Sequence, residues 1–368
     1  MTTFPVRGLY VHIPFCRSKC GYCDFVSAAG REDLIDDYIK ALSLEAASFR
    51  ALSGNFSTLY IGGGTPSLLS PAQLEKLFAA ITPLTGPVTN LAESTFEANP
   101  ESLDDRKAAL LKSAGISRIS LGLQTWQDGL LKKLGRIAMS ADFLKAYGAL
   151  RAAGFANINA DLMCGLPGQR MKDLEESLAR LLELEPEHVS LYALEVHKGT
   201  PFHAAGVKEA PEEAAEMYKT AAAILKSAGL ARYEISNFSL SGREAAHNLN
   251  YWEQGEYLGL GTAAASHLDG ERRANTTDTT VFIEAALAGS AIPQQYRETL
   301  KGRAKRAEKI MLGLRKTAGI ELHDDIIIEF SIAINRLLAA GLVEMKDRTL
   351  SIREDHLYVS NAVFREFV

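Results

Sequence analysis

The sequence has no excess of basic residues and few cysteines. Its 368 residues include 40 Lys and Arg against 45 Asp and Glu, which gives a formal net charge of −5. There is no surplus of positive charge to neutralise phosphates, so we expect no nucleic acid partner. Of the four cysteines, three are clustered. This spacing is not that of a disulfide framework and indicates a reducing compartment.

Long apolar runs are also missing. No stretch reaches the ~20 apolar residues that a membrane-spanning helix requires. The first residues lack the charged and then apolar pattern of a secretory signal. We therefore expect a cytoplasmic protein, and leave peripheral membrane contact and a homodimer open. The composition, 47% hydrophobic and 23% charged, is that of an ordinary globular chain.

Three cysteines do occur in one short run, Cys16-Arg-Ser-Lys-Cys20-Gly-Tyr-Cys23. Three thiolates on one tight loop suit a [4Fe–4S] cluster in which one iron has no protein ligand and can bind a small molecule. Two other interpretations stay open from the spacing alone. One is a zinc site that recruits His12 as its fourth ligand, and the other is a set of structural cysteines.

One pattern recurs as far as residue 232: a short apolar run, a loop and an amphipathic helix. We expect helices at 33–49 and after Ser70-Pro71, where Ser70 is the N-cap. The repetition predicts an α/β fold, a partial parallel (β/α)6 barrel, with a doubly wound open sheet as the alternative. Strands are expected at 9–13, 58–61, 94–98, 118–122, 157–163 and 189–194.

The chemically distinctive residues come where these strands end. The carboxyl ends of parallel strands meet on one face of a barrel, where active sites assemble. We therefore expect one shared site there. In chain order it contains Cys16–Cys23, the turn Gly62-Gly63-Gly64-Thr65-Pro66, Glu97, Gln124 and Asp161.

The pattern breaks between 233 and 295, where Asp269-Gly270 signals a hairpin turn. The hairpin argues against a dinucleotide fingerprint in Gly259-Leu-Gly261-Thr-Ala-Ala264, because a helix should follow such a motif. Helices at 299–314 and 324–339, then a hairpin at 341–352, predict a small α+β domain that resembles a winged helix. Its mixed charge favours a packing or lid role over DNA binding. The expected domains are 1–232, 233–295 and 296–368.

The cysteine run, the Gly-Gly-Gly-Thr-Pro turn and Glu97-Ala-Asn-Pro, in that order, resemble the radical S-adenosylmethionine (SAM) superfamily. The resemblance implies that the open iron chelates the amine and carboxylate of SAM. It also implies that one electron from the cluster can cleave SAM to a 5′-deoxyadenosyl radical. It therefore favours a cluster over zinc at Cys16, Cys20 and Cys23.

Four further runs resemble the oxygen-independent coproporphyrinogen III oxidase-like branch, and the resemblance covers nearly the whole chain. They are Tyr10-Val-His-Ile-Pro-Phe-Cys, Leu121-Gly-Leu-Gln-Thr-Trp, Leu134-Gly-Arg and Asp161-Leu-Met-Cys-Gly-Leu-Pro-Gly. In this family Arg136 can pair with a carboxylate, whereas Glu97 or Asp161 can bind ribose hydroxyls or the ammonium. The resemblance implies SAM contacts at Tyr10, Tyr22, Gly63, Gly64, Thr65, Glu97, Gln124, Arg136 and Asp161.

Two departures separate the chain from the true oxidase. Phe25 stands where the oxidase has a further cysteine, and the cluster motif starts at Cys16, whereas the oxidase is longer at its N-terminus. Both features resemble the HemW branch of haem chaperones. The His-Asn-x-x-Tyr-Trp run of that branch is present as His247-Asn248-Leu-Asn-Tyr251-Trp252. The resemblance implies haem binding through His247 as axial ligand, with Tyr251 and Trp252 packed beside it.

These resemblances imply a haem chaperone that holds a [4Fe–4S] cluster and SAM and passes haem to haem-requiring acceptor proteins. An electron donor such as flavodoxin or ferredoxin is implied as well. The alternative is a radical enzyme that acts on coproporphyrinogen, although we expect no oxidase activity. Two positions depart from the family pattern. His267 is displaced by two residues, and Cys164 replaces a tyrosine and is expected to be a buried small hydrophobe.

Overall fold

The computed structural model describes residues 7–367. Six parallel strands form the centre of its main sheet, and each lies within two residues of the bounds that the sequence predicts. They pair in chain order, so the parallel partial barrel is confirmed. The strands are β1 (Arg7–Ile13), β4 (Thr58–Gly63), β5 (Glu93–Ala98), β6 (Arg118–Gln124), β7 (Ile158–Cys164) and β8 (His188–Ala193).

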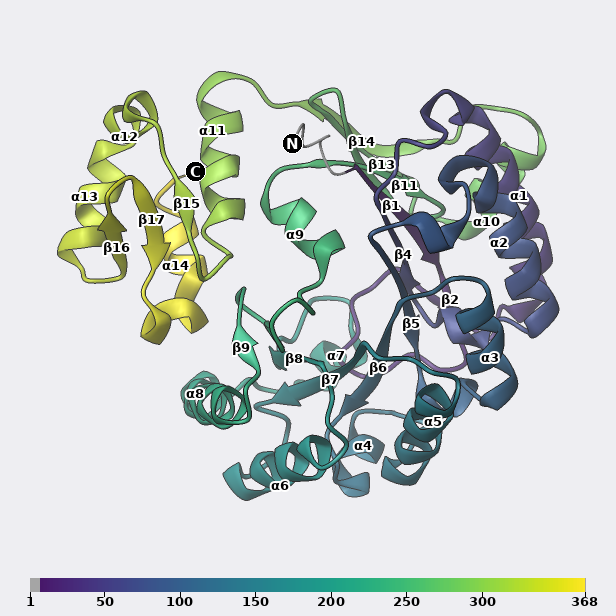
Figure 1. Ribbon diagram of the computed structural model, residues 1–368, viewed down its shortest axis with the longest axis horizontal. Coiled ribbons are helices and arrows are strands. Elements are labelled where there is room, and N and C mark those ends of the chain that lie inside the picture. Colours follow the sequence, from purple (N-terminus) through teal and green to yellow (C-terminus); the bar gives the residue numbers. More distant parts are fainter. Residues whose placement is uncertain (1–6, 368) are drawn as a thin grey trace.

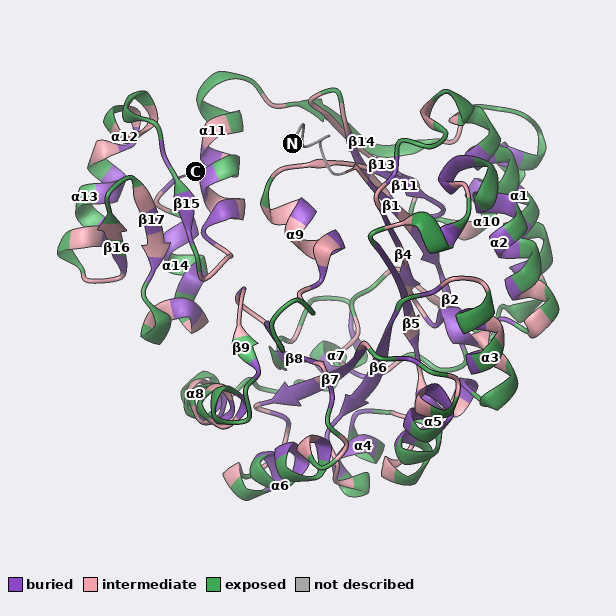
Figure 2. Ribbon diagram, viewed as in Figure 1, coloured by how far each residue is buried: buried purple, intermediate pink, exposed green. Residues whose placement is uncertain are grey.

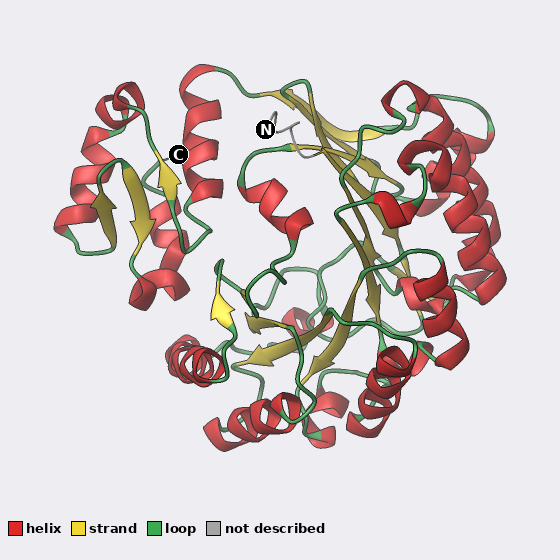
Figure 3. Cartoon of the chain, viewed as in Figure 1, coloured by secondary structure: helices red, strands yellow, loops and turns green. Residues whose placement is uncertain are grey.

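Helices cover the convex side of this curved sheet (Figures 1 and 3). Their inner faces are buried and their outer faces exposed (Figure 2). The predicted start of α2 is confirmed: Ser70 forms a capping box with Gln73, and Pro71 is the first helical residue. These helices are α1 (Ile35–Ser48), α2 (Pro71–Thr85), α3 (Asp105–Ser113), α4 (Asp128–Lys133), α5 (Ser140–Ala152), α6 (Met171–Leu182) and α8 (Pro211–Ser227). The one-turn α7 (Pro201–Ala204) lies instead within the curve of the sheet (Figure 1).

The segment from 233 to 295 extends the same sheet, which the sequence did not predict. Strand β11 (Glu256–Leu260) pairs in parallel with β1, and three antiparallel strands follow. Asp269 and Gly270 have φ values of 51° and 75°, so the predicted hairpin turn between β12 and β13 is confirmed. The remaining elements are β9 (Ala231–Arg232), β10 (Asn237–Ser239), α9 (Ala246–Trp252), β12 (Ala265–Leu268), β13 (Glu271–Asn275), α10 (Thr279–Leu287) and β14 (Gln294–Thr299).

The C-terminal part is a small α+β unit with its own apolar core, which includes Phe330, Leu350 and Phe367. The helix predicted at 324–339 is two helices that meet at Phe330. Leu258 and Phe282, from the preceding segment, belong instead to the core of the barrel. The division of the chain at 232 and 295 stays a prediction. The elements are α11 (Gly302–Gly313), β15 (Ile320–Glu321), α12 (Asp324–Glu329), α13 (Ser331–Ala339), β16 (Val343–Lys346), β17 (Thr349–Ile352) and α14 (Ser360–Phe364).

The alternation of side chains along the strands places polar groups inside the partial barrel. On β6, Ile119 and Leu121 pack in the apolar core, whereas Arg118 and Ser120 line an inner cavity. Helix α9 and the C-terminal unit lie across the open, concave side (Figure 1). None of the helices in the described part of the chain combines the length and apolarity that crossing a bilayer requires.

Candidate functional site

The three clustered cysteines lie on a loop that is anchored at several points. Strand β2 (Phe15–Cys16) pairs with β3 (Ala28–Ala29) and closes the loop. Within it, the Gly21 amide donates to the Leu134 carbonyl at 2.9 Å, and the Gly21 carbonyl accepts from the Phe202 amide at 2.8 Å. A Cβ at Gly21 would lie 2.2 Å from the Phe202 ring, so this position requires glycine.

The surroundings of the thiols suit iron–sulfur ligation. Thr65 Oγ1 donates to Cys16 Sγ at 3.4 Å, and Arg136 Nη1 lies 4.0 Å from Cys20 Sγ. Burial raises the pKa of the Cys16 thiol and raises that of Cys23 to about 11, so these two thiols stay protonated until iron displaces the protons. The nearby donors then stabilise the thiolates. The cysteines therefore fit a [4Fe–4S] cluster, which would supply an open iron and one electron.

The zinc alternative does not fit. His12 Nδ1 lies 2.8 Å from the Tyr10 hydroxyl, and His12 Nε2 lies 2.8 Å from the Val26 carbonyl oxygen. Both ring nitrogens are occupied, so His12 has none left for a metal. Within residues 7–367, no three potential ligands converge on the position of a single ion.

A cavity of about 670 Å³ lies beside this loop, and we call it the cluster cavity. All the predicted cluster and SAM residues except Tyr10 line it, although they come from four strand ends and two loops. They are Cys16, Cys20, Tyr22, Cys23, Gly63, Gly64, Thr65, Glu97, Gln124, Arg136 and Asp161. The structure therefore brings the predicted set together.

Glu97 is held at the end of β5 by two donors. Its Oε1 accepts from the Tyr60 hydroxyl at 2.6 Å, and its Oε2 accepts from the Gly63 amide at 3.0 Å. A Cβ at Gly62 would lie 2.7 Å from Glu97 Cδ, so the glycine turn makes room for this carboxyl. Burial raises the pKa of Glu97 to about 7. A cationic ligand beside Glu97 would stabilise its charged form.

Asp161 and Arg136 are also fixed by the barrel. Asp161 Oδ1 accepts from the side-chain Nδ2 of Asn159 at 2.8 Å, and burial raises the pKa of Asp161. Arg136 Nη2 donates to the Gly122 carbonyl at 3.0 Å. That carbonyl lies just before Gln124, where β6 is irregular and φ is 70°. The irregular strand end keeps Arg136 beside the cluster loop, where its charge suits a carboxylate.

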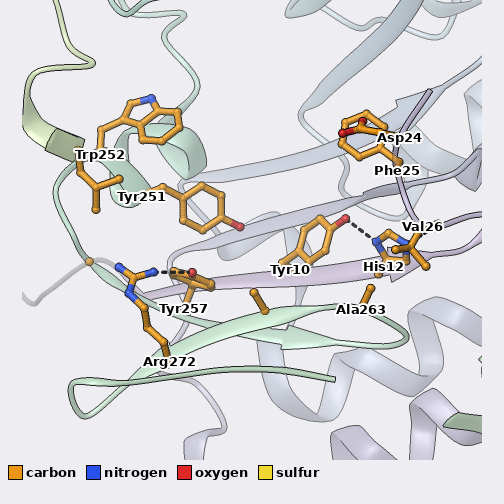
Figure 4. A pocket seen from close by; sticks show the side chains of 13 residues that line it. Tyr10, His12, Asp24, Phe25, Val26, Tyr251, Trp252, Tyr257, Ala263 and Arg272 are labelled. Atoms are coloured by element: carbon orange, nitrogen blue, oxygen red, sulfur yellow. Dashed lines mark hydrogen bonds between the residues drawn. The ribbon is translucent and has the colours of Figure 1, made fainter. Parts of the chain in front are cut away.

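A second cavity of about 570 Å³ adjoins the first, and we call it the aromatic cavity. Figure 4 shows Tyr251 and Trp252 on one side of it and Phe25 on the other, with Tyr10 between them. Asp24 and Phe25 line both cavities, so the cluster loop forms a wall that the two share. Tyr10, predicted as a SAM contact, lies on this second cavity. Its lining residues are Tyr10, His12, Asp24, Phe25, Val26, Tyr251, Trp252, Gly255, Tyr257, Ala263, Ala265, Arg272 and Leu312.

Comparisons with known proteins agree with this geometry. The family model for the radical SAM superfamily matches residues 10–181. The chain is 35% identical over 377 residues to the heme chaperone HemW of Bacillus subtilis (strain 168), covering 99% of each chain. It is 37% identical over 349 residues to the heme chaperone HemW of Lactococcus lactis subsp. lactis (strain IL1403), covering 94% of this chain and 90% of that one. The chain belongs to the HemW family.

Membership of the HemW family confirms the resemblance found in the sequence. The match to the radical SAM superfamily implies a [4Fe–4S] cluster and SAM as cofactors. The fold is shared more widely. Coproporphyrinogen III oxidase (HemN) from Escherichia coli superposes with a TM-score of 0.85 at 22% identity, covering 99% of this chain and 90% of that one. At that identity the likeness shows a common fold, and the partial barrel of radical SAM type is confirmed.

The HemW-type run His247–Trp252 forms helix α9, but His247 does not fit the predicted role of axial ligand. Its ring is fully buried. Nδ1 lies 2.9 Å from Thr58 Oγ1, and Nε2 lies 2.8 Å from the Tyr251 hydroxyl. An iron ligand needs a free nitrogen that faces the porphyrin, and His247 offers none in this structure. Tyr251 and Trp252, by contrast, line the aromatic cavity.

Three residues that line the cluster cavity were not predicted from the sequence. Arg118 lies in the floor of the cluster cavity with 2% of its surface exposed, and its Nε is buried without a partner among the described residues. A charged residue at the start of a buried strand is a signal that was available. Arg315 and Tyr358, from the C-terminal unit, also line this cavity. Only the folded chain brings them there, and no local pattern marks them.

Proposed function

We propose that this protein is a haem chaperone that binds haem in the aromatic cavity and holds a [4Fe–4S] cluster and SAM in the cluster cavity. One observation carries the proposal. The His-Asn-x-x-Tyr-Trp run places Tyr251 and Trp252 on the wall of a cavity whose opposite wall is the cluster loop. The cavity has the volume and the mainly apolar lining of a site for a flat organic ligand.

Arg272 suits the carboxylate edge of the porphyrin. It is the one lysine or arginine on the described lining of the aromatic cavity. Its Nη2 donates to Glu308 at 2.8 Å, and its Nη1 donates to the Tyr257 hydroxyl at 3.3 Å. A haem propionate can take the place of Glu308 on this guanidinium, because both are carboxylates. Haem would then enter with its propionates toward Arg272 and its other edge toward Phe25.

Membership of the family supports several further roles. We propose that the protein acts in the cytoplasm and delivers haem to haem-requiring acceptor proteins. A flavodoxin or ferredoxin would reduce the cluster. The open iron would bind SAM, which Tyr22, Gly63, Gly64, Thr65, Glu97, Gln124, Arg136 and Asp161 would orient. Peripheral membrane contact and a homodimer belong to the same proposal, and neither is needed for the site.

Titration with haemin tests the proposal directly. The anaerobically reconstituted protein should bind haemin saturably, at one haem per chain. Arg272→Gln should weaken binding by ~10-fold, because one charge-assisted pair to a propionate is lost. Arg297→Gln is the matched control: Arg297 lies on the neighbouring strand β14, is 64% exposed and pairs with Glu271. Equal titration curves for the two variants would contradict the assignment of the propionate end.

The pKa of Glu97 predicts a pH dependence of SAM binding. The N–H groups of the iron-bound amine of SAM would donate to a charged carboxylate, and the pKa of Glu97 in the ligand-free protein is about 7. Affinity should therefore rise by ~10-fold between pH 6 and pH 8 as the need to remove a proton disappears. Calorimetric titration of SAM at several pH values measures this rise. Glu97→Gln should bind SAM more weakly and without this slope, so identical pH profiles would contradict the assignment.

Glu97 also makes the stability of the fold depend on pH, but stability should fall as pH rises, whereas SAM affinity should increase. The pKa of Glu97 is raised in the folded protein from 4.5 to about 7. The native state therefore holds this proton more tightly than the unfolded state does. The Glu97 contribution to the free energy of unfolding should fall as pH rises from about 4.5 to about 7.

A further inference from the structure

Two tyrosine–histidine pairs face the aromatic cavity. Tyr251 and His247 meet at 2.8 Å between the hydroxyl oxygen and Nε2, with their rings almost perpendicular at 82°. Tyr10 and His12 meet at 2.8 Å between the hydroxyl oxygen and Nδ1. In the first pair the tyrosine lines the cavity and the histidine lies fully buried behind it. The geometry therefore presents a phenol oxygen, and not an imidazole nitrogen, to a ligand in the cavity.

The partners of His247 indicate where its proton lies. Thr58 is buried, and its hydroxyl has no partner among the described residues other than His247 Nδ1. Buried donors are almost always satisfied, so the Thr58 hydroxyl donates to Nδ1. The remaining nitrogen then carries the hydrogen, and Nε2–H donates to the oxygen of Tyr251. This leaves the hydroxyl proton of Tyr251 free to point into the cavity.

The second pair has the opposite polarity. His12 Nε2 faces the Val26 carbonyl oxygen at 2.8 Å, and a carbonyl can only accept. His12 Nε2 therefore carries the hydrogen, and Nδ1 accepts the proton of Tyr10. The hydroxyl hydrogen of Tyr10 therefore points to its histidine, whereas the hydroxyl hydrogen of Tyr251 does not. Of the two tyrosines, Tyr251 is the one prepared to exchange its proton for a metal ion.

We propose that the phenolate oxygen of Tyr251 ligates the iron of ferric haem, and that His247 is a positioning residue that donates a hydrogen bond to this oxygen. The inference rests on the proposed function. Tyrosine is an established axial ligand of haem iron. In the step, hydroxide on the ferric iron takes the proton of the Tyr251 hydroxyl and leaves as water, and the iron–oxygen bond to Tyr251 forms. The oxidation state of the iron does not change.

The surroundings of His247 support this division of roles. Burial lowers the pKa of His247 to about 3, so the imidazole stays neutral and keeps its donor hydrogen. A Cβ at Gly8 would lie 2.9 Å from His247 Cε1, which shows how closely β1 covers the ring. Direct ligation by His247 would require this packing and both hydrogen bonds to break. An N–H donated to a phenolate needs no rearrangement.

Haemin binding to reconstituted variants tests the ligand, with visible absorption and resonance Raman spectra as readouts. Wild type should show the iron–phenolate vibrations and charge-transfer band. Tyr251→Phe should lose them and bind haemin more than ~10-fold more weakly, because a metal ligand is lost. Tyr296→Phe removes a hydroxyl from the exposed strand β14, outside the cavity, and should keep the phenolate signature. Thermal unfolding and iron content confirm that each variant is folded.

Variants of His247 separate ligand from positioning residue. His247→Ala should keep the phenolate bands at shifted frequency, with ~10-fold weaker haemin binding, and His247→Gln, which retains an N–H donor, should recover part of the loss. An imidazole-ligated spectrum that survives Tyr251→Phe and disappears in His247→Ala would overturn the proposal. So would loss of the phenolate signature in Tyr10→Phe instead. If wild type binds no haemin, the proposed function itself fails, whereas wild-type binding without a phenolate signature overturns the ligand assignment alone.

Discussion

A Cys20→Ala variant should contain no [4Fe–4S] cluster. Cys16, Cys20 and Cys23 are the proposed protein ligands, and removal of one leaves two thiolates for a cluster that needs three. The only other cysteine cannot replace it: Cys164 is fully buried on β7, and burial raises the pKa of its thiol to about 12. After anaerobic reconstitution, iron and sulfide analysis and the visible absorption of the cluster should both fall to background.

Cys164→Ala is the control for this experiment. Its thiol packs in the barrel core with Sγ 3.8 Å from the Ala214 carbonyl oxygen, away from the cluster cavity. The variant should keep full iron and sulfide, with a loss of about 1 kcal/mol in the free energy of unfolding for the small cavity created. A complete cluster in Cys20→Ala, or its loss in Cys164→Ala, would contradict the ligand assignment.

An Arg136→Ala variant should lose most of its affinity for SAM. The guanidinium is fixed by the Gly122 carbonyl and lies beside Cys20, where the open iron would place the SAM carboxylate. Removing one partner of a buried charge pair costs about 2 kcal/mol or more, which is a ~30-fold weaker affinity. Perturbation of the electron paramagnetic resonance spectrum of the reduced cluster, measured against SAM concentration, gives the affinity.

Two further variants serve as controls for the Arg136→Ala measurement. Arg136→Lys keeps the charge but loses the planar fork, so its affinity should lie between those of wild type and Arg136→Ala. Arg180→Ala, on the surface of α6 with 53% of the side chain exposed, should bind SAM as wild type does. Iron analysis must show an intact cluster in each variant. Wild-type affinity in a fully loaded Arg136→Ala protein would exclude the proposed contact.

The barrel could be predicted from the sequence because its signals are local. Each central strand is a short apolar run, and the helices between strands carry apolar residues at helical spacing. The extension by β11 to β14 was not predicted. Strand β11 is only five residues long, so its apolar run is short and is interrupted by Gly259. Strand β14 is exposed along its whole length and shows no apolar pattern. Their strand conformation depends on pairing with β1 and with one another.

The sequence predicted that the residues of the site come together, whereas their roles as ligands and contacts stay predictions. The cysteines, the glycine turn and the acidic strand ends have fixed spacings, and the structure gathers them in one cavity. The role of His247 depends on Thr58, which is 189 residues away in sequence and occupies Nδ1. Tyr10 lies on the aromatic cavity because of the path of β1 through the barrel. Hydrogen bonds between distant segments decide such roles, and spacing along the chain does not contain them.

The central claim is that the protein carries haem and does not oxidise coproporphyrinogen. The most direct test is one anaerobic sample with intact cluster, SAM and reductant, divided between two assays. The first loads haem and follows its transfer to an apo haem protein. The second adds coproporphyrinogen III beside a genuine oxidase as positive control. We predict stoichiometric haem binding with transfer and no protoporphyrinogen. Protoporphyrinogen formation at a rate near that of the control, without haem transfer, would contradict the account.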